Sequence, residues 1–257
     1  MGADREALLD FSSEMGRELM RNGAEIYRVE ESVERLLRAY GCRETEVFAI
    51  PSCIIVNIRE DGKNYTKAAR IKSCANNLRR LEKLNALCRS ICRDTPSMED
   101  NRRRMDEVMN EPCYPAWVSY LAHGFVAAFF TLFWGGGPLD AAVAFPCGLI
   151  VRWVVTAMRG LRANVFFTNL LAGMLCSLPP LLLARMTAGL KPDQIIIGTI
   201  MLLVPGIAIT NVMRDILAGD FLTAVTRLAE VLIVGFGIAV GVALAITAAR
   251  LAGPGLV

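Results

Sequence analysis

Histidine is almost absent from this sequence of 257 residues: the only one is His123, which lies in an apolar run. The first half of the chain has no histidine, and it also lacks a GxSxG motif and a glycine-rich loop that would cradle a phosphate. A nucleophilic side chain there would be without its usual base. These absences argue against an enzyme, and no motif indicates a cofactor.

Charged residues are scarce in the second half of the chain. Residues 1–115 hold 20 Lys and Arg and 20 Asp and Glu, whereas residues 116–257 hold only 8 and 5. The chain therefore has a charged, soluble part and an apolar part. The charges of the first part balance and form no basic stripe with interleaved aromatics, so no nucleic-acid partner is expected. A signal peptide is not expected either, because residues 1–30 are too charged.

Metal-binding and disulfide patterns are also missing. The eight cysteines include no CxxC pair, and Cys88 and Cys92 lie four residues apart on one helix face. Because the single histidine lies elsewhere, in an apolar run, the sequence predicts free thiols and no metal site. No internal repeat indicates a solenoid.

The charged part predicts a small cytosolic α+β domain over residues 1–98. Apolar residues at three-to-four spacing predict helices over 6–40, with a break at 22–23. Three β-rich runs follow, and the Asp-Gly pair at 61–62 is a hairpin turn signal. A further helix is expected over 73–92.

Residues 99–115 are predicted to form a charged juxtamembrane linker helix. It contains the run Arg102-Arg103-Arg104, shortly before the first apolar segment. Basic residues at this place are typical of the cytoplasmic face of a lipid bilayer, where anionic lipids attract each of them by about 1 kcal/mol. The bilayer is therefore an expected partner of the chain.

Residues 116–257 predict a membrane domain. Its apolar runs cover, in turn, 116–134, 138–158, 163–184, 194–213 and 221–249. Each run is long enough to cross a hydrocarbon core of about 30 Å as a helix. Gly235, Gly237 and Gly241 in the last run form a small-residue face, which predicts close helix packing. The predicted fold is an α-helical membrane protein with five transmembrane helices, preceded by a small cytosolic α+β domain.

Basic residues between the apolar runs predict the orientation. On the side of the charged domain lie Arg159, Arg162 and Arg214, and on the other side lie Arg185, Lys191 and Arg250. The outer loop after the first run is uncharged, and the Arg102-Arg103-Arg104 run adds to the inner side. The positive-inside rule then predicts a multi-pass protein of the plasma (inner) membrane, with a cytoplasmic N-terminus and an external C-terminus.

The fourth apolar run is interrupted by a Pro-Gly pair and followed by polar residues. Proline removes a backbone donor and glycine weakens a helix, so the carbonyl groups before them must face protein or a water-filled cavity. Broken helices of this kind line solute sites in transporters. The predicted solute-binding residues are Pro205, Gly206, Thr210, Asn211, Arg214 and Asp215. An ordinary proline kink before an inner loop is the alternative.

Other ionisable residues in the apolar part are candidates because charge at membrane depth is costly. Arg152 lies about 20 Å along the second predicted span, where it could bind a carboxylate solute or extend to the inner surface. His123 could serve proton coupling or make one interhelical hydrogen bond. Arg227 and Glu230, at i and i+3, form either an interfacial ion pair or part of an ion pathway. Asp140 is expected to be a solvated cap, with ion coupling as the alternative.

Three segments resemble the threonine/serine exporter family, ThrE-like: residues 22–41, the strand region up to residue 71, and residues 205–230. The Pro-Gly, Thr-Asn, Arg-Asp and Gly-Asp pairs of the third segment are the most specific part. The resemblance implies export of small amino or carboxylic acids, such as threonine, serine or succinate, driven by a proton or ion gradient.

The chain looks like the larger subunit of the split form of this family, similar to the YjjP-type component of a succinate exporter. That resemblance implies a small YjjB-type membrane subunit as partner, and it leaves a homo-oligomer open. A membrane-anchored cytosolic hydrolase or sensor domain is the alternative function. An anchor needs one span, however, and this sequence offers five.

Overall fold

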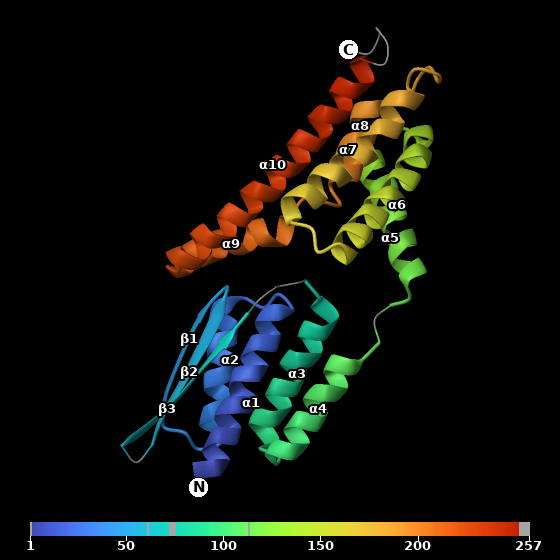
Figure 1. Cartoon of the computed structure of the whole chain (residues 1–257). Helices are drawn as coiled ribbons and strands as arrows, with labels where there is room; N and C mark the ends of the chain where they lie inside the picture. Colours follow the sequence, from blue (N-terminus) through green and yellow to red (C-terminus); the bar gives the residue numbers. More distant parts are fainter. Residues whose placement is uncertain (1, 61, 72–75, 113, 252–257) are drawn as a thin grey trace. The chain divides into compact units, whose positions relative to one another are not determined.

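The computed structural model describes residues 2–60, 62–71, 76–112 and 114–251 (Figure 1). The chain divides into two units, Met1–Pro112 with Asp220–Thr223, and Cys113–Gly219 with Ala224–Val257. The first unit contains the strands of the described chain, and the second contains the apolar helices. This division follows the change from charged to apolar sequence.

Four helices and one antiparallel sheet form the first unit. The elements are α1 (Gly2–Arg21), α2 (Ile26–Ala39), β1 (Glu44–Ile50), β2 (Cys53–Glu60), β3 (Lys63–Arg70), α3 (Leu78–Asp94) and α4 (Met98–Asn110). The strands are ordered β1-β2-β3. The predicted break at 22–23 is confirmed: Gly23 has a φ of 97°, a left-handed conformation that favours glycine, and α1 ends just before it.

Two predicted features of this unit lie partly outside the described residues. At the predicted hairpin turn, Asp61 is not described, whereas Gly62 has a φ of 73° and lies between β2 and β3. The helix predicted over 73–92 begins at Leu78, and residues 72–75 are not described. The Asn77 side chain caps this helix by accepting a hydrogen bond from Arg80 N at 3.1 Å.

The core of the first unit lies between its helices and one face of the sheet. Ile54, Val56 and Ile58 alternate along β2 and are fully buried, as expected for a strand with one covered face. They belong to one apolar cluster with Met15 of α1 and Leu36 of α2. The amphipathic spacing of the helices is therefore explained by this core.

The predicted linker helix packs into this core. Met105 of α4 is buried in the apolar cluster, and the fully buried Asn101 donates from Nδ2 to the Tyr40 hydroxyl at 2.6 Å. That hydroxyl in turn donates to the Pro96 carbonyl oxygen at 2.6 Å. Helix α4 is thus a packed element of the first unit.

Six helices form the second unit. They are α5 (Ala116–Phe133), α6 (Pro138–Gly160), α7 (Val165–Leu183), α8 (Pro192–Ile200), α9 (Gly206–Ala218) and α10 (Phe221–Leu251). Four of them, α5, α6, α7 and α10, are long and apolar enough to cross a membrane. The five predicted transmembrane helices are not all confirmed, because the fourth apolar run, predicted to be broken, forms the two short helices α8 and α9.

Pro205 explains why the fourth run is divided. Its nitrogen has no hydrogen, so it cannot donate to a carbonyl one turn back. After α8 ends at Ile200, the chain makes tight turns: Leu203 N donates to Ile200 O at 2.8 Å, and Gly206 N donates to Val204 O at 2.9 Å. Residues 201–205 are therefore not helical, and α9 begins at Gly206.

Glycine residues bring α10 close to α7. A Cβ atom on Gly237 would lie 2.8 Å from the Phe166 carbonyl oxygen, and one on Gly241 would overlap the Leu170 carbonyl oxygen. A Cβ atom on Gly235, by contrast, would meet no atom within 4 Å. Two of the three glycines of the predicted packing face therefore make the helix contact.

We expect Gly241→Ala to lower the melting temperature of the purified protein in detergent by about 5 °C. The added methyl group meets backbone atoms that cannot rotate away, and such overpacking typically costs about 1–3 kcal/mol. Gly235→Ala is the matched control on the same helix, and its melting temperature should equal that of the wild type. Equal shifts for both variants would show that α10 does not pack on α7 through Gly241.

Candidate solute site

Asp140, at the start of α6, is buried and joins two other segments. Its Oδ2 accepts a hydrogen bond from Gly137 N at 2.7 Å, and its Oδ1 accepts one from Lys191 N at 2.9 Å, just before α8. Asp140 is only 2% exposed. The cap expected in solvent is therefore a buried one, and the carboxylate holds the starts of α6 and α8 at the same end of the unit.

Helix α9 buries two of its polar residues and exposes most of its apolar ones, while its other two polar residues, Thr210 and Arg214, are exposed. Asn211 and Asp215 lie four residues apart on one face and are 9% and 3% exposed, whereas Met213 and Leu217 are 57% and 84% exposed. This is the reverse of a helix on the surface of a soluble protein. Ionisable residues in membrane segments normally face the interior of the bundle, so the arrangement fits a helix with lipid on its outer side.

An ion pair joins this polar face to α10. Arg227 Nε lies 3.6 Å from Asp215 Oδ2, and both side chains are largely buried, at 17% and 4% exposed. The pair predicted within α10, Arg227 with Glu230, is not formed among the described residues. Glu230 is exposed instead. Arg227 pairs with Asp215 because a buried carboxylate needs a counter-charge more than an exposed one does.

The other residues of the predicted solute site do not lie on the face of α9 that carries Asn211 and Asp215. Thr210 is exposed, and its hydroxyl donates to the Gly206 carbonyl oxygen of the same helix at 3.1 Å. Arg214 is also exposed. Pro205 precedes α9 and Gly206 is its first residue, so both shape the break. Of the six candidates from Pro205 to Asp215, only Asn211 and Asp215 are buried, and they lie on the same face of α9.

The hydrogen bond of His123 differs from the interhelical one expected from the sequence. Its ring Nδ1 lies 2.7 Å from the Ser119 carbonyl oxygen, one turn earlier on the same helix. Because a carbonyl oxygen only accepts, Nδ1 carries the proton in this contact. The hydrogen bond is therefore within α5 and does not join two helices.

Arg152 lies in the middle of α6, in a different group of residues. Its guanidinium is half-buried and lies over the ring of Tyr120 on α5, 6.0 Å from the ring centroid. Sequence reasoning did not single out Tyr120, because the contact depends on how α5 and α6 align. The sequence had offered Arg152 as a binder of the solute together with the residues after the break, whereas the structure places it over Tyr120 and pairs Asp215 with Arg227.

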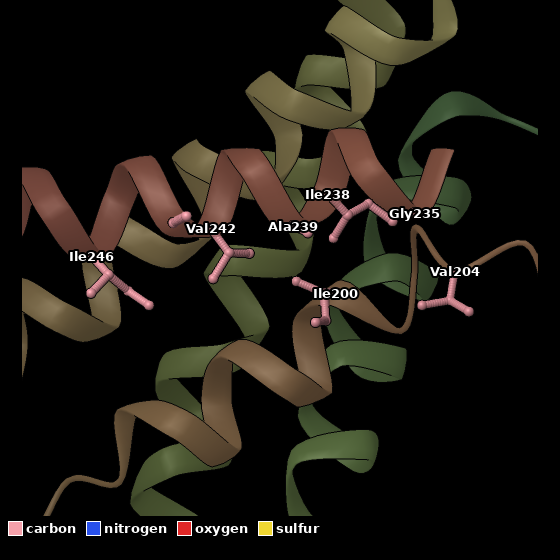
Figure 2. Close-up of a pocket in the computed structure, with 8 residues that line it drawn as sticks. Ile200, Val204, Gly235, Ile238, Ala239, Val242 and Ile246 are labelled. Carbon is pink, nitrogen blue, oxygen red and sulfur yellow. The ribbon is translucent and has the colours of Figure 1, made fainter. Parts of the chain in front are cut away.

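An apolar groove lies beside the break. It has a volume of about 460 Å³ and is lined by Ile200 and Val204 together with Gly235, Ile238, Ala239, Val242, Ala243 and Ile246 of α10. Figure 2 shows Ile200 and Val204 on one side and the α10 residues on the other. No lining side chain can hydrogen-bond or pair with a small acid, so this groove is not the candidate solute site.

Two cysteines on α3 of the first unit are relevant to the alternative function, a hydrolase domain. Interaction with the neighbouring Cys88 lowers the pKa of Cys92 to about 7, and the same interaction together with burial raises the pKa of Cys88, whose Sγ donates to the Ser32 carbonyl oxygen at 3.7 Å. A thiolate at Cys92 is a potential nucleophile. It has no histidine as base, because the only histidine of the chain is in the second unit.

Known proteins similar to this chain are transporters and membrane proteins. The chain is 24% identical to the threonine/serine exporter of Corynebacterium glutamicum, over 93% of this chain and 50% of that protein. It is 26% identical to the pheromone-regulated membrane protein 10 of Eremothecium gossypii, over 88% and 32%. It is 25% identical to the probable succinate transporter subunit YjjP of Escherichia coli, over 89% and 90%.

These relatives differ in length. The chain spans about half or less of the two longer relatives and nine tenths of the YjjP subunit. No solved structure gives a significant match. The model of the threonine/serine exporter family, ThrE, matches residues 10–249, which include nearly all of both units. The chain therefore belongs to the threonine/serine exporter family.

Proposed function

We propose that this chain is a subunit of a secondary-active exporter of small amino or carboxylic acids in the plasma membrane. The observation that carries the proposal is the buried polar face of α9, which follows the break in the fourth apolar run: Asn211 and Asp215 are buried there, and Asp215 forms an ion pair with Arg227 of α10. Polar groups next to a helix break are typical of solute sites in transporters. Membership of the exporter family supports the same function.

The charges of this site favour an amino acid over a dicarboxylate. A zwitterion can present its carboxylate to Arg227 and its ammonium group to Asp215, while Asn211 supplies a hydrogen bond. Each buried charge then keeps a counter-charge when the internal ion pair opens. Succinate would satisfy Arg227 but would place a second carboxylate near Asp215. Serine and threonine are therefore the preferred solutes of this site.

We expect the purified chain alone to give little solute flux in liposomes, and flux to appear when a small YjjB-type membrane subunit is added. The relative from Escherichia coli that this chain nearly spans is named as a subunit, which supports a partner. The assay compares serine, threonine and succinate side by side. Robust flux by the chain alone would contradict the need for a partner. A hydrolytic activity of the first unit would support the alternative function.

The fourth crossing of the membrane is made, in this proposal, by α8 and residues 201–205 together. Helix α8 starts at the end of the unit where α6 starts, and its nine residues extend only about 14 Å. Residues 201–205 continue in tight turns and do not add the about 17 Å of an extended chain, so this crossing is shorter than the hydrocarbon core of about 30 Å. Within this unit, α5 begins and α10 ends at opposite ends (Figure 1).

We therefore expect thiol reagents to label Cys53 and a cysteine introduced near Val257 from opposite sides of the membrane. Residues 252–257 lie outside the described residues, so this position tests topology alone. The native Cys53 is half-buried on β2, and it should react only after the cells are opened. If both cysteines or neither were labelled in intact cells, they would lie on the same side of the membrane. The chain would then cross it an even number of times, which would contradict the proposed topology.

A further inference from the structure

We infer that Arg152 of α6, held by Tyr120 of α5, is an anion site that binds an oxyanion of the carboxylate or phosphate class. This anion site lies on α5 and α6, whereas the Asp215–Arg227 ion pair lies on α9 and α10. The carboxylate could be that of the exported solute, bound at a second position apart from Arg227, in which case the inference rests on the proposed function. The phosphate could be that of an anionic lipid, in which case it does not.

Gly148 positions the two helices for this site. A Cβ atom on Gly148 would overlap the His123 carbonyl oxygen and lie 2.9 Å from the Ala127 Cβ, so α5 and α6 are in direct contact here. Arg152 follows Gly148 by one turn on α6, and Tyr120 precedes His123 by about one turn on α5. In an antiparallel pair, these steps bring Arg152 against Tyr120, where the structure places it.

The guanidinium of Arg152 lies in the second unit and has no counter-charge among the described residues. It lies eight residues before Gly160, the last residue of α6, which corresponds to about 12 Å along the helix. Its Nε is buried and donates no hydrogen bond, and no carboxylate of the described residues forms an ion pair with it.

The neighbours of Arg152 do not supply the missing negative charge. The ring face of Tyr120 attracts the cation weakly and fixes its direction. His123 lies within electrostatic reach of Arg152, and its Nδ1 donates to the Ser119 carbonyl oxygen at 2.7 Å. A guanidinium offers five donors in a planar fork that matches carboxylate and phosphate oxygens. An oxyanion therefore satisfies both the charge and the free donor.

The test uses the full chain in phosphatidylcholine nanodiscs and measures two ligands separately. One arm measures equilibrium binding of labelled serine and succinate. The other adds phosphatidylglycerol and measures its retention by native mass spectrometry. Arg152→Gln should weaken binding in one of the two arms by about 30-fold. Arg159→Gln, an exposed arginine on the same helix, is the matched control and should bind as the wild type does.

The outcomes separate the two sources of the anion. Loss in the first arm identifies a solute carboxylate, and loss in the second identifies a lipid phosphate. Unchanged binding in both arms by folded Arg152→Gln would overturn the site. If that variant does not fold, Tyr120→Leu decides with the same readout, because it leaves the charge but removes its support. Arg152-dependent binding without any transport would count against the exporter function and not against the site.

Discussion

Arg227→Gln should abolish transport by the reconstituted exporter. The substitution leaves the Asp215 carboxylate buried without its cation, and breaking one side of a buried ion pair costs about 3–5 kcal/mol. It also removes the group that receives the carboxylate of the solute. We expect flux to fall by at least about 30-fold and the melting temperature to fall with it, and Asp215→Asn should have the same effects.

The double variant Asp215→Asn/Arg227→Gln separates stability from transport. With both charges removed no uncompensated charge is buried, so the melting temperature should recover while serine and threonine flux does not. Asn211→Ala should impair flux without affecting membrane insertion. Thr210→Ala is the control, because the exposed Thr210 hydroxyl bonds only within its own helix. If Glu230→Gln abolishes flux and Arg227→Gln does not, the functional charge lies elsewhere on α10.

Gly198→Val should prevent the second unit from folding correctly. A Cβ atom on Gly198 would lie 2.5 Å from the backbone nitrogen of Thr131 and would overlap its hydroxyl. Thr131 is fully buried in α5, and its hydroxyl donates to the Ala127 carbonyl oxygen at 2.9 Å, so it cannot move aside. The two extra methyl groups of valine increase the overlap, and we expect the melting temperature to fall by about 10 °C.

Gly198→Val tests whether α8 packs against α5. This packing determines where the break and α9 lie. Gly160→Ala is the control: a Cβ atom on Gly160, at the end of α6, would meet no atom within 4 Å. Gly206→Ala, at the first residue of α9, should likewise be tolerated, because the break depends on Pro205 and not on the glycine. A folded Gly198→Val protein with wild-type stability would show that α8 does not pack on α5.

Local features of the structure follow from short stretches of sequence. The left-handed backbone at Gly23 ends a helix whatever the following residues form. Pro205 interrupts a helix because its nitrogen has no hydrogen to donate. Of the five apolar runs predicted to cross a membrane, four form helices that are long and apolar enough to do so, because length and composition alone determine that property. The polar residues after Pro205 also identified α9 as the candidate site.

Contacts between distant segments could not be predicted in the same way. The i, i+3 spacing of Arg227 and Glu230 favoured a pair within one helix, but Arg227 pairs with Asp215, because α9 turns that carboxylate inwards. Asp140 was expected in solvent and is buried, because the start of α8 supplies the donor at Lys191. In both cases a partner from another helix decides the environment of the charge.

The sequence by itself determined the two-part organisation of this protein, the family and the position of the break. These depend on composition and on interactions between residues close in the chain. Only the tertiary structure decided which face of α9 is buried, which cation pairs with Asp215, and that Arg152 lies over Tyr120. Those contacts depend on helix register and rotation, which are set by the close approach of backbones at glycines such as Gly148 and Gly241.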